Sequence, residues 1–483
     1  MIETYHMPPG ELDRLATGLF RRWEQRDHTF WLDSGCVVER LGRFSFLGTD
    51  PAALILYDGE RTRLTWPQGG REWDGDPLAA LADVARPLLQ APELHDEVPF
   101  TGGLVGYLTY DLGLRLAGVR SRHIAGGGFP LLLFGLYDTL VCLDHRDGLL
   151  HLISCSHAMG GSTGRAKERL LWLRREVEAV RAQSAGAVPD FHPAHVNWRE
   201  EIDGSGARLI GDFTRTAYLQ AVERIQGVIR RGPLQQVNLS QRFRTETRLS
   251  GGDLYWRLRG ASPAPFGAAL RTGGRWILSA SPERLFSVRR SEVETRPIKG
   301  TRPRSDDPDL DTALRHDLTQ HPKDRAEHLM IVELAQEELG AVCDVDTVHV
   351  PELMQVESYR TVHQLVSTVR GRLLPHKDAV DCLRALFPGA SITGRPKRQA
   401  MEVIDAAEPV ARGVYTGTIG YLGLGGAADF NVAIRTIVLA DGVATFHVGG
   451  AIVAASQPAA EYEETLDKAE GLVQAILAEG APR

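Results

Sequence analysis

The chain has 483 residues, with 55 Lys and Arg against 62 Asp and Glu, a formal net charge of −7 and 43% hydrophobic residues. This composition is typical of a globular protein with two to three average domains, or of one large α/β or α+β unit. It disfavours nucleic acid as a partner, because neutralising phosphates needs a surplus of Lys and Arg that this chain lacks.

Neither a membrane span nor a secretion signal is expected. The longest apolar stretch, Phe129 to Tyr137, is about half of the roughly 18 residues that a spanning helix needs. The N-terminus, MIETYHMPPGELD, lacks the basic and apolar regions of a secretory signal, so we expect a cytoplasmic protein. The cysteines are odd in number and scattered, a pattern that indicates reduced thiols without a zinc site.

The first part of the chain, up to about residue 150, is predicted to be mostly β structure. Short apolar runs bounded by Gly or Asp indicate the strands: FWLDSG, GRFSFLG, AALILYDG, GGLVGYLTYD and LYDTLVCLD. A charged segment, Arg165 to Arg181, has apolar residues at helical spacing. The stretch of small residues after it predicts a linker near Gln183 to Gly211, between an N-terminal region, residues 1–200, and a C-terminal region, residues 211–483.

The C-terminal region mixes predicted helices with predicted strands. Apolar spacing indicates helices over Thr216 to Gly232, Lys323 to Leu339 and Glu461 to Leu477. Alternating apolar runs between them indicate strands, among them RWILSASPERLFSV, GTIGYLGL, NVAIRTIVL and ATFHVGGAIVA.

Two of these helices each carry a pair of carboxylates at i, i+3, a spacing that places both on one face. The pairs are Asp324 with Glu327 and Glu461 with Glu464. If the helices face each other, the four carboxylates would form an oxygen-only site of the kind that Mg²⁺ prefers. An isolated pair at this spacing is more often a solvated helix face, and Glu464 with Lys468 is also an ordinary surface ion pair.

Other segments offer candidates for ligand binding or catalysis. Gly449 and Gly450 would let a ligand carboxylate approach backbone N–H groups, or would mark a bulge or a close strand contact. Ser391 stands ahead of a predicted helix whose N-terminus could bind an anion. Lys299, in ETRPIKGT, would be a nucleophile if burial lowered its pKa, and Glu283, in SASPERLF, would be a proton carrier. Both residue types are more often solvated charges.

These segments, in this order, resemble the chorismate-utilising enzymes over Thr216 to Leu472, more than half of the chain. The motifs that carry the resemblance are SASPER, RPIKGTRPR, KDRAEHLMIVEL, ITGRPKRQAME, VYTGTIGYLG, AIRTIVL and EYEETLDKA. WLDSG and GRFSFLG are similar to the N-terminal region of the large subunits of anthranilate and aminodeoxychorismate synthases. The resemblance implies an α+β fold of two packed, mainly antiparallel sheets with outer helices and an active site between them.

The resemblance also assigns roles to particular residues. In this family two acidic pairs hold Mg²⁺ over the ring carboxylate of chorismate, and they match Asp324, Glu327, Glu461 and Glu464. The positions that contact the carboxylates and ring of the substrate match Ser391, Tyr415, Arg435, Gly449, Gly450 and Lys468. A dianionic ligand would explain why a net-negative protein needs a local cluster of cations and a metal.

Lys299 is the residue that separates activities within the family. Anthranilate synthases look like PIAGT here, whereas aminodeoxychorismate synthases carry PIKGT, with the lysine as the proposed nucleophile; this chain has PIKGT. The implied function is that of aminodeoxychorismate synthase component I, which converts chorismate and ammonia to 4-amino-4-deoxychorismate for p-aminobenzoate and folate biosynthesis. Lys299 would attack C2 while Glu283 protonates the departing C4 hydroxyl, and ammonia would then attack C4 and expel the lysine.

Ammonia in this family comes from a glutamine amidotransferase with a Cys-His-Glu triad. No such domain is recognisable in the sequence, so the resemblance implies a separate partner subunit. The alternatives are anthranilate synthase component I or another chorismate enzyme, such as an isochorismate or salicylate synthase. A catalytically silent sensing or scaffold subunit on the same fold is a further alternative, against which the intact acidic pairs and the lysine argue.

Three positions complete the comparison with the family pattern. The family commonly has a His directly before LVS, whereas TVHQLVS places Gln364 there and His363 one residue earlier, on the opposite face of a strand. We expect this change to disfavour anthranilate formation, and Gln364 could still hydrogen-bond the substrate. The glycine loop of the family ends here in Ala451, which lacks the freedom of glycine at positive φ. Ser34 matches an LxS motif that belongs to a tryptophan pocket in related large subunits.

Overall fold

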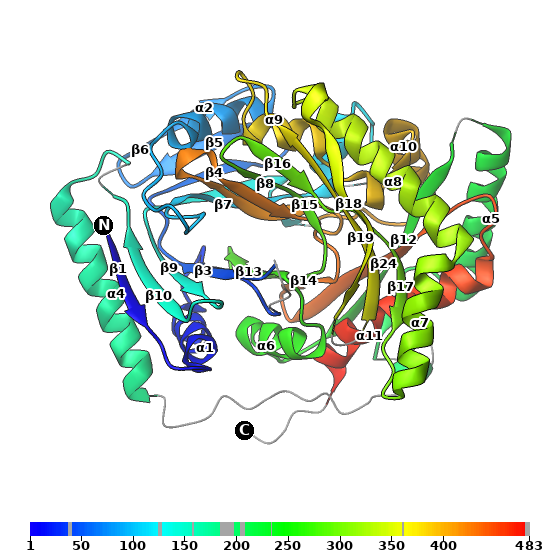
Figure 1. Ribbon diagram of the computed structural model, residues 1–483, viewed down its shortest axis with the longest axis horizontal. Helices are drawn as coiled ribbons and strands as arrows, with labels where there is room; N and C mark the ends of the chain where they lie inside the picture. The colour runs from blue at the N-terminus through cyan, green and yellow to red at the C-terminus, as the bar shows by residue number, and fades with distance from the viewer. Residues whose placement is uncertain are drawn as a thin grey trace.

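Two antiparallel β-sheets of 12 strands each form the centre of the molecule, and helices cover their outer faces (Figure 1). The computed structural model describes residues 1–36, 41–123, 128–156, 159–183, 198–202, 208–232, 234–359 and 362–478. This architecture confirms the predicted α+β fold.

The first sheet contains strands from both ends of the chain. In spatial order its strands are β1 (Ile2–His6), β10 (Leu149–Ser154), β9 (Thr139–Asp144), β3 (Phe44–Gly48), β2 (Phe30–Asp33), β13 (Phe266–Thr272), β14 (Arg275–Ser281), β23 (Thr436–Ala440), β24 (Val443–Ile452), β12 (Gln236–Glu246) and β11 (Ile210–Gly211). Strand β20 (Gly394–Arg395) also pairs with β12.

The second sheet is built in the same mixed way. In spatial order its strands are β17 (Ile298–Pro303), β19 (Val362–Arg372), β16 (Glu292–Thr295), β15 (Arg284–Arg289), β22 (Ala428–Asn431), β21 (Thr418–Gly423), β7 (Gly103–Leu108), β8 (Leu132–Tyr137), β4 (Ala53–Tyr57), β5 (Thr62–Trp66) and β6 (Gly69–Trp73). Strand β18 (His349–Ser358) pairs with β19.

The helices lie in two groups, one over each sheet. The helices of the described residues are α1 (Glu11–Trp23), α2 (Pro77–Leu89), α3 (Tyr110–Leu116), α4 (Thr163–Gln183), α5 (Arg215–Arg231), α6 (Gly251–Ala261), α7 (Pro308–Gln320), α8 (Pro322–Gly340), α9 (Ala379–Leu386), α10 (Lys397–Ala407) and α11 (Pro458–Leu477). Short 3₁₀ segments are η2 (Trp198–Glu201), η3 (Val345–Thr347), η4 (Ala390–Ile392) and η5 (Leu424–Gly426).

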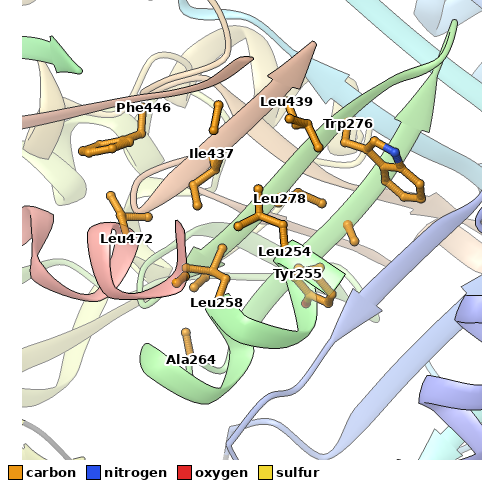
Figure 2. Close-up of a cluster of buried hydrophobic side chains, with 14 of the residues drawn as sticks. Leu254, Tyr255, Leu258, Ala264, Trp276, Leu278, Ile437, Leu439, Phe446 and Leu472 are labelled. Carbon is orange, nitrogen blue, oxygen red and sulfur yellow. The ribbon is translucent and has the colours of Figure 1, made fainter. Parts of the chain in front are cut away.

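The hydrophobic core has three parts, which follow from this layering. One part lies between the first sheet and helices α1, α4, α5, α6, α10 and α11. A second lies between the other sheet and helices α2, α8 and α9. The third fills the space between the sheets, with Phe46 and Ile277 from the first and Tyr107 and Tyr421 from the second. Figure 2 shows part of the first cluster, where Leu258 of α6 and Leu472 of α11 lie against strands β14, β23 and β24.

Strands of the N-terminal and C-terminal regions alternate in both sheets. Strand β2 pairs with β13, and β7 pairs with β21. Residues 1–200 and 211–483 therefore share continuous hydrogen-bonded sheets. The predicted linker lies mostly in residues 184–197 and 203–207, outside the described residues.

Most of the predicted elements are confirmed, with small shifts at their ends. The helices predicted over residues 165–181, 216–232, 323–339 and 461–477 are α4, α5, α8 and α11. The N-terminal region, predicted to be mostly β, also contains α1, α2 and α3. The signals for α2 are present in the sequence, because Asp76 caps the helix by accepting a hydrogen bond from the Leu78 N–H and Pro77 occupies its first turn.

Two smaller expectations bear on the chemistry of the chain. None of the five cysteines forms a disulfide, as predicted. Among the described residues, no helix combines the length and the hydropathy that crossing a membrane requires.

Candidate active site

Helices α8 and α11 bring one acid of each predicted pair to the same lysine. Lys323 Nζ lies 3.8 Å from Glu327 Oε1 on α8 and 4.0 Å from Glu461 Oε1 on α11. Burial of Glu461 raises its pKa, and the nearby charge of Glu464 adds to this effect. The helices therefore face each other, as the metal-site prediction requires.

Strand β24 forms the floor beneath the second acidic pair. A Cβ atom at Gly450 would lie 3.4 Å from Glu461 Oε2 and 3.6 Å from Glu464 Oε1, which places both carboxylates in van der Waals range of this strand position. Lys468 Nζ contacts Glu464 Oε1 at 2.7 Å and donates a hydrogen bond of 2.9 Å to the Gly449 carbonyl. The charge of Lys468 lowers the pKa of Glu464 against the effect of burial.

The backbone at Gly449 and Gly450 is an ordinary strand. Both residues, with Ala451, lie inside β24 and pair with β12 in regular register. Ala451 therefore needs no positive φ here. Gly449 lies in close contact with the neighbouring strand, one of the structural explanations given above for the glycine pair. A Cβ atom there would lie 2.6 Å from the Leu239 carbonyl oxygen.

Asp324 has surroundings that differ from those of the other three acids. Arg302 Nη2 donates to its Oδ2 at 2.8 Å, and His321 Nδ1 lies 3.2 Å from the same oxygen. A Cβ atom at Gly300 would lie 3.4 Å from Asp324 Cβ. Asp324 thus packs against strand β17, with one carboxylate oxygen already engaged by protein donors.

Lys299 lies on β17 and is within range of the charges of both acidic helices and of Glu283. Burial lowers its pKa, the charge of Lys468 lowers it further, and the charges of Glu327, Glu464 and Glu283 oppose this shift. Among the described residues Lys299 has no ion pair within 4 Å. A lysine with a lowered pKa has a larger fraction of neutral, nucleophilic amine at neutral pH.

Glu283 lies at the junction of β14 and β15, where the chain passes from one sheet to the other. The Val432 N–H donates to the Glu283 carbonyl at 3.0 Å, which fixes its backbone. Burial raises the pKa of Glu283 to about 7, while a hydrogen bond from Ser391 and the charges of Lys299 and Lys468 oppose the shift. A carboxyl group that titrates near 7 can give and take protons at neutral pH.

Tyr415 and Arg435 are both largely removed from water. The Tyr415 ring stacks on His447 with ring centroids 5.1 Å apart and an interplanar angle of 10°. Burial raises the pKa of Tyr415 and lowers that of Arg435. Within the described ranges the Arg435 guanidinium has no carboxylate within 4 Å, so its charge lacks a protein counter-ion.

Gln364 and His363 lie next to each other on β19 and have different environments. His363 contacts Ser358 Oγ at 2.8 Å and Asp311 at 3.0 Å on α7. Gln364 is buried, and its Oε1 has no hydrogen-bond partner among the described residues. The predicted opposite orientation of the two side chains agrees with these contacts.

Ser34 lies apart from this cluster, on the wall of a cavity of about 310 Å³ between the sheets. Its hydroxyl donates to the Phe44 carbonyl at 2.7 Å. The cavity is also lined by Asp33, Arg43, Phe46, Phe266, Arg284, Tyr421 and Asp429. None of the other predicted site residues lines it, and the tryptophan pocket stays a prediction.

The carboxylate groups on α8 and α11 are of the chemical type that a magnesium ion prefers. Glu327 Oε1 is buried without a hydrogen-bond partner in the described part of the chain. Glu461 and Glu464 contribute further carboxylate oxygens next to Gly450. Hard oxygen ligands of this kind suit Mg²⁺, and a bound cation would stabilise a buried carboxylate oxygen that accepts no hydrogen bond.

Two residues at the site were not identified from the sequence, although both stand in the motif KDRAEH. Lys323 bridges the two acidic helices, as described above. His328 is fully buried and contacts the Lys299 carbonyl at 3.2 Å through Nδ1. Their position beside predicted acids was the only available signal, because their contacts come from distant segments.

A lysine of lowered pKa, a buried carboxyl group of raised pKa, an arginine without a carboxylate partner and an acidic cluster define an enzyme site for an anionic substrate. The chain belongs to the family of chorismate binding enzymes, whose sequence profile matches residues 23–474.

Named relatives and one solved structure agree with this assignment. Aminodeoxychorismate synthase component 1 of Klebsiella aerogenes is 36% identical over 445 residues, which cover 92% of this chain and 93% of the relative. Anthranilate synthase component 1 of Thermus thermophilus is 37% identical over 470 residues, 96% of each chain. The crystal structure of anthranilate synthase component I from Streptococcus pneumoniae has a TM-score of 0.76 at 30% identity, over 90% of this chain and 94% of that one. The overall sequence identity to relatives of the two kinds is thus nearly equal. The site residues must therefore distinguish the two activities.

Proposed function

We propose that the chain is the chorismate-aminating component of an aminodeoxychorismate synthase, which converts chorismate and ammonia to 4-amino-4-deoxychorismate. The observation that carries the proposal is the lysine at position 299 of β17, whose pKa is lowered by burial and which lies within range of the charges of Glu283 and Glu327. An enzyme that adds ammonia directly to the ring needs no such amine, whereas covalent catalysis does.

The anionic groups of chorismate have matching cations in the site. Arg435, which has no carboxylate partner in the described residues, and Lys468 would bind its carboxylates. Backbone groups of Gly449 and Gly450, the Tyr415 ring, Ser391 and the Gln364 amide would complete the contacts. The free Oε1 of Gln364 is suited to accept a hydrogen bond from a substrate hydroxyl.

Asp324, Glu327, Glu461 and Glu464 would hold Mg²⁺. When bound, the ion would neutralise the ring carboxylate of the substrate and fix its orientation. Glu327 and Glu461 are best placed for this role, because Asp324 is bonded to Arg302 and Glu464 to Lys468.

The chain's own groups account for two successive displacements. The neutral Lys299 amine forms a bond to C2 of the ring, both ring double bonds shift, and the C4 hydroxyl leaves as water with a proton from Glu283. Ammonia then bonds to C4, both double bonds shift back, and the Lys299 amine leaves. The proton lost by the new amino group returns Glu283 to its acid form. The pKa of about 7 at Glu283 suits both directions of proton transfer.

Ammonia would come from a glutamine amidotransferase subunit. The relatives from Klebsiella aerogenes and Escherichia coli are named component 1, a name that supports a second component for this chain too. The product would serve p-aminobenzoate and folate biosynthesis.

Anthranilate synthesis is the second candidate, and the 37% identity to an anthranilate synthase component favours it. The deciding experiment is incubation of the protein with chorismate, Mg²⁺ and an ammonium salt, followed by separation of the products by mass and retention time. We expect 4-amino-4-deoxychorismate, which keeps its enolpyruvyl group. Anthranilate, isochorismate or salicylate as the main product would overturn the proposal.

A further inference from the structure

A chain of three hydrogen bonds ends at the backbone of Lys299. The Met354 N–H donates to Ser367 Oγ at 2.9 Å, Ser367 Oγ lies 2.7 Å from His328 Nε2, and His328 Nδ1 lies 3.2 Å from the Lys299 carbonyl oxygen. His328 and Ser367 are both fully buried. The chain connects β18, β19 and α8 to β17.

The partners fix the direction of each bond. A carbonyl oxygen can only accept, so His328 Nδ1 carries the hydrogen that it donates to Lys299. In the neutral imidazole His328 Nε2 is then the acceptor, and the Ser367 hydroxyl donates to it while accepting from the Met354 N–H. Every donor and acceptor in the chain then has one role.

The strand register leaves the peptide of Lys299 without a paired residue on β19. Ile298 pairs with Val366 and Thr301 with Gln364, but the register shifts between these pairs, so Lys299 and Gly300 have no cross-strand partner. Gly300 has a φ of 90°, which favours glycine, as expected at a bulge. The hydrogen bond from His328 replaces the ladder bond that the bulge removes.

We propose that His328 and Ser367 are positioning residues for Lys299, which hold its peptide at the bulge so that its amine faces Glu283 and Glu327. This inference rests on the proposed function of Lys299. Glu327 and His328 are neighbours on α8, so one helix fixes both the acidic side of the site and the backbone of the nucleophile. Neither His328 nor Ser367 touches the substrate in this role.

The test compares His328→Leu, which removes both side-chain bonds, with His328→Asn, whose amide can still donate to the Lys299 carbonyl. Since a misplacement of about 1 Å can cost roughly a hundredfold in rate, we expect His328→Leu to lower kcat by about that factor. The KM for chorismate should stay within about threefold, because the groups that bind its carboxylates are unchanged. His328→Asn should recover most of the lost kcat.

His151→Leu is the matched control for the loss of a buried histidine. His151 is buried in β10 of the first sheet and bonded to Thr4 Oγ1 at 3.0 Å, away from the site. We expect it to lower the melting temperature without lowering kcat. If His328→Leu does not fold, Ser367→Ala takes its place, since it removes the acceptor of the Met354 N–H and the donor to His328 together.

Three results would overturn the inference: wild-type kcat in the His328→Leu or Ser367→Ala protein, no recovery in His328→Asn, or an equal loss of kcat in the control. Failure of the proposed function is recognised separately, by an unexpected product or by full turnover of Lys299→Ala. With Lys299 shown to be essential, an unchanged kcat in His328→Leu would reject the positioning role alone.

Discussion

Two polar regions lie between the sheets, and they differ in whether all of their charged groups are paired within the protein. In the Ser34 cavity, Asp33 Oδ2 accepts from Arg259 at 2.7 Å and from Tyr255 at 3.0 Å, and Arg284 is bonded to both Asp429 and Glu294 at 2.8 Å. In the Lys299 site, within the described residues, Arg435 has no carboxylate partner and Glu327 Oε1 has no hydrogen-bond donor.

Charges without a partner in the protein indicate the region that is arranged for a reaction. A buried charge whose partner is part of the protein is neutralised before any ligand arrives. A buried charge without such a partner keeps its electrostatic potential available to an ionic ligand, at a cost in stability. The shifted pKa values of Glu283 and Lys299 belong to the second kind of region.

The replacement Lys299→Ala should produce the largest effect and tests whether the second region reacts at all. Removal of the amine should lower formation of 4-amino-4-deoxychorismate by roughly a thousandfold or more, because the covalent route is lost. Binding of chorismate, measured by calorimetry without ammonia, should change little. Lys377→Ala removes a lysine paired with Asp381 at 3.2 Å and should leave turnover unchanged. Equal activity of the two variants would contradict a role for Lys299.

Glu283→Gln should lower turnover by about a hundredfold to ten-thousandfold, the usual range for loss of a general acid. The pH profile sharpens this test. With a pKa of about 7, Glu283 is protonated below pH 7 and loses its proton above it, so kcat of the unmodified protein should fall as pH rises through 7. The variant should lack this limb. A persistent limb near pH 7 would assign it to another group.

The same group should make stability depend on pH. The pKa of Glu283 is raised from 4.5 to about 7 on folding, so the folded protein binds more protons between these values. Its stability should therefore decrease by about 3 kcal/mol as pH rises from 4.5 to above 7. Denaturant titrations at pH 5 and pH 8 should give a smaller difference for Glu283→Gln than for the unmodified protein.

Asp33→Asn tests the Ser34 cavity, in which the charges are paired within the protein. The Asp33 side chain is 1% exposed and is paired with Arg259, so loss of its charge should leave that guanidinium without its buried partner. We expect unfolding to become easier by about 3 kcal/mol with little change in kcat. Asp467→Asn, which loses an exposed pair with Arg199, should cost well under about 1 kcal/mol. A large fall in kcat at unchanged stability would show that the Ser34 cavity takes part in the reaction.

Sequence patterns predicted the features of the site that depend on residues close together along the chain. The faces of α8 and α11 follow from the i, i+3 spacing, and both helices were predicted within three residues at each end. The pairing of Asp324 with Arg302 was not predictable, because it depends on where β17 lies against α8. The same holds for the bulge at Lys299, which is a property of strand register and not of local composition.

The smallest effect in this series concerns the unequal roles of the acids. Glu461 is buried next to Gly450 and has no arginine partner among the described residues, whereas Asp324 shares an oxygen with Arg302 and His321. Loss of the less neutralised carboxylate should remove more of the potential that attracts a cation. Glu461→Gln should therefore weaken Mg²⁺ binding by at least about tenfold, and Asp324→Asn should weaken it less. Calorimetric titration of each protein with Mg²⁺ measures this difference, and equal losses would mean that Arg302 leaves Asp324 when the ion binds.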